Sequence, residues 1–186
     1  MPRIAELTIA ALALLIAAPP LLVAAIAIKL DSRGPVVYRA RRVGRDGIEF
    51  ELLKLRTMHT GNDPAGVGTP VLAGDPRVTR VGSLLRRLSL DELPNLFNVI
   101  RGEMAIVGPR PTLAAQVEAY TPHQRRRLAV KPGITGWAQV NGRAGIGWEE
   151  RIELDVWYVE HRSLPLDLRI LARTARLLVT GHGLYG

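Results

Sequence analysis

The sequence predicts an α+β protein in which an N-terminal re-entrant membrane segment, folded as helix–break–helix, precedes a small mixed α/β globular domain with interfacial amphipathic helices. Three observations predict this fold. An uncharged apolar run extends from Leu7 to Ile28, with Pro19 and Pro20 at its centre. Two short segments, 36–39 and 48–55, have the composition of strands and flank the turn-forming sequence Gly44-Arg-Asp-Gly47. Several later segments have the spacing of amphipathic helices.

The two prolines decide how the apolar run would sit in a bilayer. A straight helix over this run would be about 33 Å long, enough to cross a hydrocarbon core of roughly 30 Å. Each proline lacks a backbone donor and crowds the preceding turn, so we expect the helix to break near residues 18–20. Each arm would then be about 17 Å long and reach only halfway into the bilayer. These lengths favour a re-entrant segment over residues 1–30 and a separate globular domain over residues 31–186.

Three other interpretations of the apolar run remain open. It can be a cleaved signal peptide, because Ala25-Ile-Ala27 resembles a cleavage site. It can also be a single kinked spanning helix, or a buried helix of a soluble protein. Basic residues follow the run closely, and for either membrane arrangement they place the globular domain in the cytoplasm. These residues are Lys29, Arg33, Arg39, Arg41, Arg42 and Arg45.

The rest of the chain divides into short elements. Residues 60–77 are rich in Gly, Pro, Asn, Asp and Thr and predict a loop. Helices are expected over 82–88, from 89–91 to Arg101, and over 112–129, 148–161 and 166–180, and a glycine-rich loop with one short strand over 131–143. The last helix has Arg169, Arg173 and Arg176 on one face. That face is either solvated or lies in the lipid headgroup layer.

The composition excludes some classes of site but does not identify the function. The chain has 186 residues, no cysteine, and 25 Lys and Arg against 17 Asp and Glu, for a formal charge of +8. Disulfides and thiolate metal sites are therefore excluded, and the histidines lack the spacing of a zinc site. A basic excess favours anionic partners: phosphorylated metabolites, lipid headgroups or nucleic acid. Charge alone suggests nucleic acid, and no recognition motif supports it.

The adjacent carboxylates Asp91 and Glu92 are the strongest chemical signal. A purely structural interpretation is available, because Ser89-x-x-Glu92 fits a capping box and Pro94 is common near a helix start. The alternative is chemical. A helix N-terminus favours phosphate and an ionised carboxylate. Two carboxylates can hold Mg²⁺ together with substrate phosphates, and an aspartate can attack phosphorus to form an acyl phosphate.

Basic residues surround this pair and suit the negative charge of a phosphoryl group in transfer. They are Lys54, Arg56, Arg86, Arg87, Arg110 and Arg143.

With these residues in place, the chain resembles the monotopic phosphoglycosyl transferases, the bacterial sugar transferases that start glycan assembly on a polyprenyl carrier. Ordered blocks along nearly the whole chain carry the resemblance. They are Lys29-Leu-Asp-Ser-x-Gly-Pro35, Arg42-Val-Gly44, Lys54-Leu-Arg-Thr-Met58, the Asp91-Glu92 stretch, Val107-Gly-Pro-Arg-Pro111, Lys131-Pro-Gly-Ile-Thr-Gly-Trp-Ala-Gln-Val-Asn-Gly-Arg143 and Glu153-Leu-Asp-Val-Trp-Tyr158.

The resemblance implies transfer of a sugar-1-phosphate from a UDP-sugar to polyprenyl phosphate, with release of UMP, at the cytoplasmic face of the bacterial inner membrane. Asp91 would be the nucleophile and a Mg²⁺ ligand, and Glu92 would assist with metal or proton. The residues at family positions lining the phosphate site are Lys54, Arg86, Arg110 and Arg143. Membrane lipids are expected partners and nucleic acid is not. The sugar, the pathway and the oligomeric state, a homo-oligomer included, are left open.

The alternative from another class is a non-catalytic, membrane-anchored protein that binds nucleotide sugar or anionic lipid.

Overall fold

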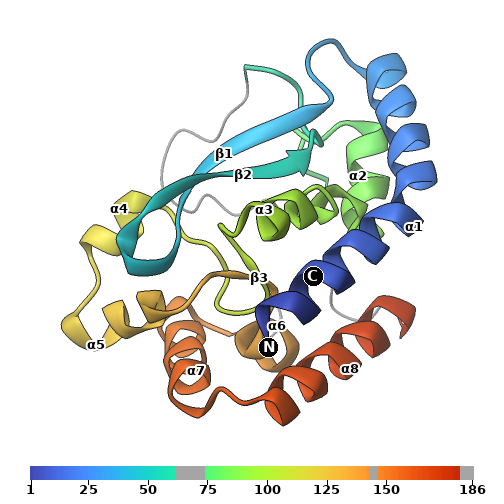
Figure 1. The fold of residues 1–186 in the computed structure, drawn as a ribbon. Helices are drawn as coiled ribbons and strands as arrows, with labels where there is room; N and C mark the ends of the chain where they lie inside the picture. The colour runs from blue at the N-terminus through green and yellow to red at the C-terminus, as the bar shows by residue number, and fades with distance from the viewer. Residues whose placement is uncertain (62–73, 143–145, 181–186) are drawn as a thin grey trace.

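The computed structural model describes residues 1–61, 74–142 and 146–180, except for the side chain of Val179. In Figure 1 the long α1 lies along one side of the molecule, the β1–β2 hairpin crosses the top, and α7 and α8 lie below. The elements in chain order are α1 (Arg3–Asp31), β1 (Val37–Val43), η1 (Arg45–Gly47), β2 (Glu49–Leu55), α2 (Arg80–Arg87), η2 (Leu90–Glu92), α3 (Asn95–Arg101), β3 (Ala105–Val107), α4 (Ala114–Glu118), α5 (Pro122–Arg125), η3 (Arg126–Ala129), β4 (Gly133–Thr135), α6 (Trp137–Gly142), α7 (Trp148–His161) and α8 (Leu164–Thr180).

The strands form two small sheets. β1 pairs antiparallel with β2, with Val37 opposite Leu55, and β3 pairs parallel with β4, with Ala105 opposite Gly133. The second pair is unusually close at its end, because a Cβ on Gly133 would lie 2.1 Å from the backbone nitrogen of Gly108. Only glycine allows that approach. Helices combined with short strands confirm the mixed α/β character that the sequence predicts.

One apolar core joins the elements that are far apart in the chain. Ala10 of α1, Leu52 of β2, Val99 of α3, Ile106 of β3 and Ile170 of α8 are buried in the same cluster. The first helix therefore packs against the globular part along its N-terminal half, and Ala24 and Ile28 continue the contact onto α2 and β2.

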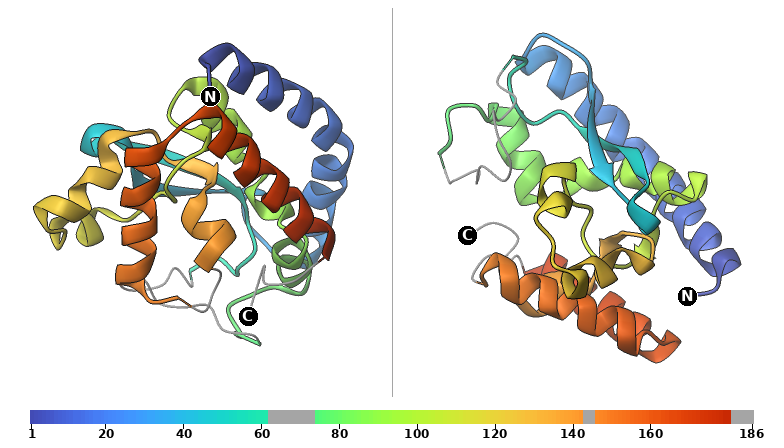
Figure 2. Two further views of the ribbon diagram at one scale, coloured as in Figure 1. Left: turned by 90° about the horizontal axis from the view of Figure 1, so that it is seen from below. Right: turned by 90° about the vertical axis from the view of Figure 1, so that its left-hand side faces the viewer.

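The predicted helix–break–helix is one helix here. Both prolines lie inside α1, which continues from Arg3 to Asp31. The helix bends instead of ending: in Figures 1 and 2 its dark-blue half and its lighter half point in different directions. Each proline removes one i→i−4 hydrogen bond and its ring crowds the carbonyl one turn back, which is the usual cause of such a kink. The hydrogen bonds on either side are enough to keep the segment helical.

Apart from Glu6 and Ile28, the residues that α1 buries are alanines, whereas many of its large apolar side chains are exposed. Ala10 and Ala17 are 0% and 6% exposed, whereas Leu15 and Leu30 are 72% and 84% exposed. In a soluble amphipathic helix the large apolar side chains face the core. The opposite distribution argues against the buried soluble helix, and by length and composition α1 can cross a membrane.

Two other predicted elements differ from the observed ones. The helix expected over 112–129 is divided into α4, α5 and η3, because Thr121 caps a new helix that begins at Pro122. The expected loop 131–143 contains β4 and also α6. Much of the loop expected over 60–77 lies outside the described residues.

The last helix, α8, buries Leu166 and Ile170, while Leu164, Leu168 and Leu178 are exposed. Its placement in the headgroup layer stays a prediction.

Candidate active site

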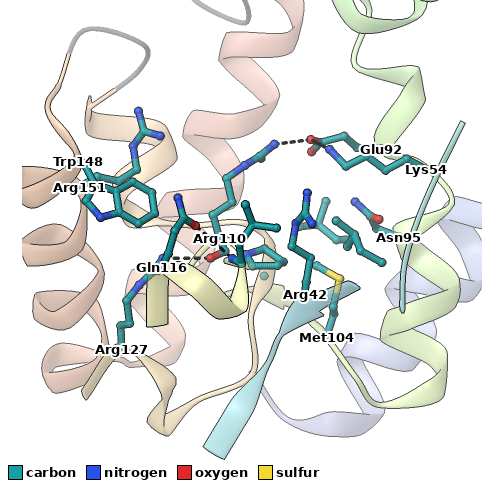
Figure 3. A pocket seen from close by; sticks show the side chains of 15 residues that line it. Arg42, Lys54, Glu92, Asn95, Met104, Arg110, Gln116, Arg127, Trp148 and Arg151 are labelled. Atoms are coloured by element: carbon teal, nitrogen blue, oxygen red, sulfur yellow. Dashed lines mark hydrogen bonds and ion pairs between the residues drawn. The ribbon is translucent and has the colours of Figure 1, made fainter. Parts of the chain in front are cut away.

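A cavity of about 180 Å³ opens between the hairpin, the β3–β4 pair and the start of α7. Figure 3 shows its side chains arranged from Glu92 and Lys54 on one side to Trp148 and Arg151 on the other, with Arg110 and Gln116 between them. The lining residues are Arg42, Leu52, Lys54, Glu92, Asn95, Met104, Arg110, Pro111, Leu113, Gln116, Arg127, Gly133, Ile134, Trp148 and Arg151. Five cations and one carboxylate make the cavity strongly positive, as an anionic ligand requires.

Glu92 holds two of these cations at once. Lys54 Nζ donates to Glu92 Oε1 at 2.6 Å, and Arg110 Nη2 donates to the same oxygen at 2.7 Å (Figure 3). Burial by itself would raise the pKa of Glu92, but Arg110 and Lys54 together lower it well below its ordinary range. Glu92 is therefore ionised and acts as the counter-ion of two residues that the sequence assigns to phosphate binding.

Asp91 lies in a different environment from its neighbour. It is 5% exposed, and its Oδ1 has no hydrogen-bond partner among the described residues. Desolvation raises the pKa of Asp91, Glu92 adds to the rise, and Lys54, Arg86 and Arg110 oppose it. The two carboxylates thus differ in kind: Glu92 is paired and strongly acidic, whereas Asp91 is buried and a weaker acid than an ordinary aspartate.

The backbone around the pair rules out the capping-box interpretation. Ser89 has φ of 54°, in the left-handed region, and makes no side-chain cap, while the side chain of Glu92 binds cations instead of the backbone. Asp91 and Glu92 lie in the 3₁₀ turn η2, and α3 begins after Pro94. Asp91 therefore does not lie at the N-terminus of α3, and burial raises its pKa.

The structure places the other predicted cations in different surroundings. Arg86 Nε donates to Thr57 Oγ1 at 2.9 Å, and its charge acts on Asp91. Arg143 lies outside the described residues. Arg56 belongs to the fold rather than the cavity, because its buried guanidinium binds the carbonyls of Arg33 and Ser32 at the end of α1. Arg87 is exposed and does not line the described cavity.

A buried ion pair that the sequence reasoning missed supports Arg110. Arg127 binds Asp155 and Tyr120, and its Nη2 donates to the carbonyl of Arg110 at 3.0 Å. The side chains of Arg127 and Asp155 are 2% and 0% exposed, so the pair is a rigid part of the core. It holds the main chain from which Arg110 reaches Glu92. Asp155 lies in Glu153–Tyr158, one of the blocks that carry the family resemblance. Its partner Arg127 is 28 residues away in sequence, so no local pattern indicates the pair.

Asn95 is a second residue of the site that the sequence analysis did not predict. It is 3% exposed, it lines the cavity, and its Oδ1 has no partner among the described residues. Asn95 follows Asp91 by four residues, so two unpartnered side-chain oxygens occur close together in sequence beside the cavity. No pattern of polar residues distinguishes this asparagine from those at surface turns.

These oxygens fit a Mg²⁺ ion that shares its ligands with a substrate. The described residues contain no cluster of three or more carboxylates and histidines. Mg²⁺ typically takes one or two protein carboxylates and completes its shell with phosphate oxygens and water. The free oxygen of Asp91 and the amide oxygen of Asn95 are donors of the required kind, whereas Oε1 of Glu92 already accepts from two cations.

A cationic cavity beside two unlike carboxylates, on a domain packed against a long exposed apolar helix, is the arrangement expected of a membrane-associated protein that acts on a phosphorylated substrate. Comparison with known proteins identifies the family. Residues 1–181 match the family model described as bacterial sugar transferase, and the chain belongs to this family.

Similar proteins carry matching names. The chain is 43% identical to an uncharacterized sugar transferase of Bacillus subtilis, over 99% of this chain and 90% of that protein. It is 45% identical to a UDP-glucose:undecaprenyl-phosphate glucose-1-phosphate transferase of Caulobacter vibrioides, over 98% of this chain and 71% of that protein. It is 39% identical to a UDP-N-acetylgalactosamine-undecaprenyl-phosphate N-acetylgalactosaminephosphotransferase of Aeromonas hydrophila, over 96% of this chain and 43% of that protein. The named sugars differ between these relatives, so similarity to them does not specify the sugar.

Proposed function

We propose that the protein transfers a sugar-1-phosphate from a UDP-sugar to polyprenyl phosphate, giving polyprenyl-diphosphate-sugar and UMP through an intermediate on Asp91. The observation that carries this proposal is the buried Asp91 carboxylate, with one oxygen unpartnered among the described residues, beside a carboxylate that holds the two cations Lys54 and Arg110. The names of the relatives support the substrate classes.

The first step uses Asp91 as the nucleophile. One carboxylate oxygen of Asp91 attacks the sugar-bearing phosphorus of the donor. A new O–P bond forms, the bond to the bridging oxygen breaks, and UMP leaves with that electron pair. Burial makes Asp91 more basic than an ordinary aspartate, which increases its nucleophilicity, provided that the pH is high enough to ionise it.

Lys54 and Arg110 supply the charge that the step requires. In the structure both bind the same oxygen of Glu92, whose single negative charge offsets one of the two positive charges, and Asp91 is not among the described residues that line the cavity. The proposal therefore includes an exchange in which the donor diphosphate takes Lys54 and Arg110 from Glu92 and brings its phosphorus to Asp91. Positioned cations of this kind stabilise the negative charge spread over the transferred phosphoryl group.

The second step returns the enzyme to its starting state. An oxygen of polyprenyl phosphate attacks the phosphorus of the acyl phosphate, and the aspartyl oxygen leaves as a carboxylate. One phosphoanhydride is thus exchanged for another. Bound Mg²⁺, held by Asp91 with Asn95 or Glu92, would neutralise phosphate charge.

For the membrane segment we propose the re-entrant arrangement, with the catalytic domain on the cytoplasmic side. Large exposed side chains on α1 and its bend at the prolines support insertion without crossing. Such an arrangement would keep both ends of α1 at the cytoplasmic surface of the membrane, where a polyprenyl phosphate headgroup lies.

The decisive experiment compares the wild-type enzyme with Asp91→Asn. With Mg²⁺ and a UDP-sugar but no lipid acceptor, we expect the wild-type enzyme to release about one UMP per protein molecule and to gain the mass of a sugar phosphate on the peptide containing Asp91. Asp91→Asn should do neither. EDTA should abolish the release in the wild-type enzyme.

Asp46→Asn is the matched control, since Asp46 is an exposed carboxylate in the hairpin turn whose positive φ asparagine tolerates. UDP-sugar binding without UMP release by the wild-type protein would favour the non-catalytic alternative. Undiminished release by Asp91→Asn would eliminate the assigned nucleophile.

A further inference from the structure

The two ends of the cavity have different chemistry. The end at Glu92 and Lys54 carries cations suited to phosphate, Lys54 and Arg110, beside Asn95 and Met104. The opposite end carries Arg151 and the aromatic face of Trp148, and the carboxamide of Gln116 lies between Trp148 and Arg110 (Figure 3). Phosphate does not require an aromatic surface, so the second end is suited to a different part of a ligand.

Trp148 is held in place but remains accessible. It is the first residue of α7, a helix anchored by the buried Ile152 and Val156. The guanidinium of Arg127 lies 6.0 Å from the centre of the indole, yet the residue is 41% exposed. A large aromatic side chain on a rigid helix, exposed into a cavity, provides a surface on which a planar ring can stack.

Gln116 is oriented by its own hydrogen bonds. Its Oε1 accepts from Thr112 Oγ1 at 2.6 Å and from the backbone nitrogen of Leu113 at 3.1 Å. Because the oxygen is used to cap α4, the two N–H groups of Nε2 are directed away from these partners. Gln116 lines the cavity, so it presents donors suited to a carbonyl oxygen.

Arg110 connects the two ends. Its guanidinium reaches Glu92, its carbonyl is held by Arg127, and in Figure 3 it lies between Gln116 and Glu92. A ligand that spans the cavity would therefore place phosphate beside Arg110 and a planar, carbonyl-bearing group beside Trp148.

We propose that the pyrimidine base of the nucleotide donor binds at this end, with its ring stacked on Trp148 and a base carbonyl accepting a hydrogen bond from Gln116 Nε2. The inference rests on the proposed function, because it assigns one half of the same donor. It makes Trp148 and Gln116 binding residues for the leaving nucleotide, with no part in the chemistry at phosphorus.

The test separates the base from the phosphate by comparing UMP with ribose 5-phosphate, which lacks the base. We expect the wild-type protein to bind UMP at least about tenfold more tightly than ribose 5-phosphate, as expected for one stacked base. Trp148→Leu should remove this advantage and raise the KM for the UDP-sugar by a similar factor. The kcat and the affinity for ribose 5-phosphate should stay near their wild-type values.

Gln116→Glu is the matched variant for the hydrogen bond, because glutamate keeps the acceptor oxygen that caps α4 and loses the two donors. It should also weaken UMP selectively over ribose 5-phosphate.

Tryptophan fluorescence gives a second readout that does not depend on turnover. UMP should quench the wild-type emission, Trp148→Phe should abolish the quenching, and Trp157→Phe should retain it. Trp157 is the control because it stacks on Trp137 at 5.0 Å, outside the cavity lining.

Equal affinity of the wild-type protein for UMP and ribose 5-phosphate would overturn the inference, as would an unchanged KM in Trp148→Leu. In either case continued UMP release would leave the proposed function standing. A wild-type protein that binds UMP with these preferences but never releases it from a UDP-sugar would refute the function and retain the binding site.

Discussion

Replacing Glu92 by glutamine tests whether this carboxylate serves as the counter-ion of Lys54 and Arg110, the two cations that we propose bind phosphate. The substitution keeps the size of the side chain and removes its charge. Lys54 and Glu92 are 21% and 19% exposed, so their charged hydrogen bond should contribute about 1.5–3 kcal/mol to the free energy of unfolding. Arg110 is 44% exposed, which limits its bond to about 0.3–1 kcal/mol.

Glutamine retains a neutral acceptor that recovers about 1 kcal/mol. The net loss should therefore be about 1–3 kcal/mol at pH 7, or a fall in Tm of about 2–12 °C. Because the pKa of Glu92 is lower in the folded protein, its contribution is present above the ordinary pKa of 4.5 and disappears as the pH falls through the folded value. The difference between variant and wild type should shrink in acid.

The same substitution should change the pH dependence of UMP release. Glu92 raises the pKa of Asp91, and Lys54 and Arg110 lower it. Removing the charge of Glu92 leaves both cations free to act on Asp91, so its pKa should fall. Activity depends on ionised Asp91, and the acid limb of the pH–rate profile should therefore move to lower pH in Glu92→Gln, even if the rate at neutral pH decreases.

The measurements are urea unfolding in detergent micelles and single-turnover UMP release between acid and neutral pH. Glu118→Gln, the same change at an exposed position on α4, is the control and should alter neither. An acid limb that stays in place or moves to higher pH in Glu92→Gln would refute the electrostatic reasoning. A stability unaffected at pH 7 would show that the two contacts contribute nothing.

Two further predictions concern the core and the membrane segment. Asp155→Asn leaves the buried Arg127 without its counter-ion and should lower the free energy of unfolding by about 3–5 kcal/mol, measured by urea unfolding; a loss below about 1 kcal/mol would contradict the rigid role of this pair. The chain has no cysteine, so Pro2→Cys and Arg33→Cys introduce single thiols at exposed positions flanking α1. Both should react with an impermeant reagent only from the cytoplasmic side. Replacing Pro19 and Pro20 by alanine in the same background should straighten α1 and permit labelling of position 2 from outside, and labelling of position 2 from outside with the prolines intact would favour a spanning helix.

Local sequence patterns were sufficient to predict the positions of several helices. The helix expected over 82–88 is α2, and the helix expected over 148–161 is α7, because their apolar spacing and their ends depend on neighbouring residues. The long apolar run is the helix α1 for the same reason. The local sequence was misleading at Ser89, which resembles an N-cap residue but adopts a left-handed conformation and caps no helix. The N-cap of the helix before it, α2, is Thr79.

The order of the residues establishes an uncharged apolar segment with two central prolines, and two adjacent carboxylates among basic residues. Only the tertiary structure assigned those carboxylates different environments. Lys54, on β2, and Arg110, after β3, bind Glu92 from positions 38 and 18 residues away in sequence. Asp91 is buried next to this cluster. Adjacent residues of the same charge are equivalent in a sequence, and they become distinct when folding decides which of them loses water and which gains a partner.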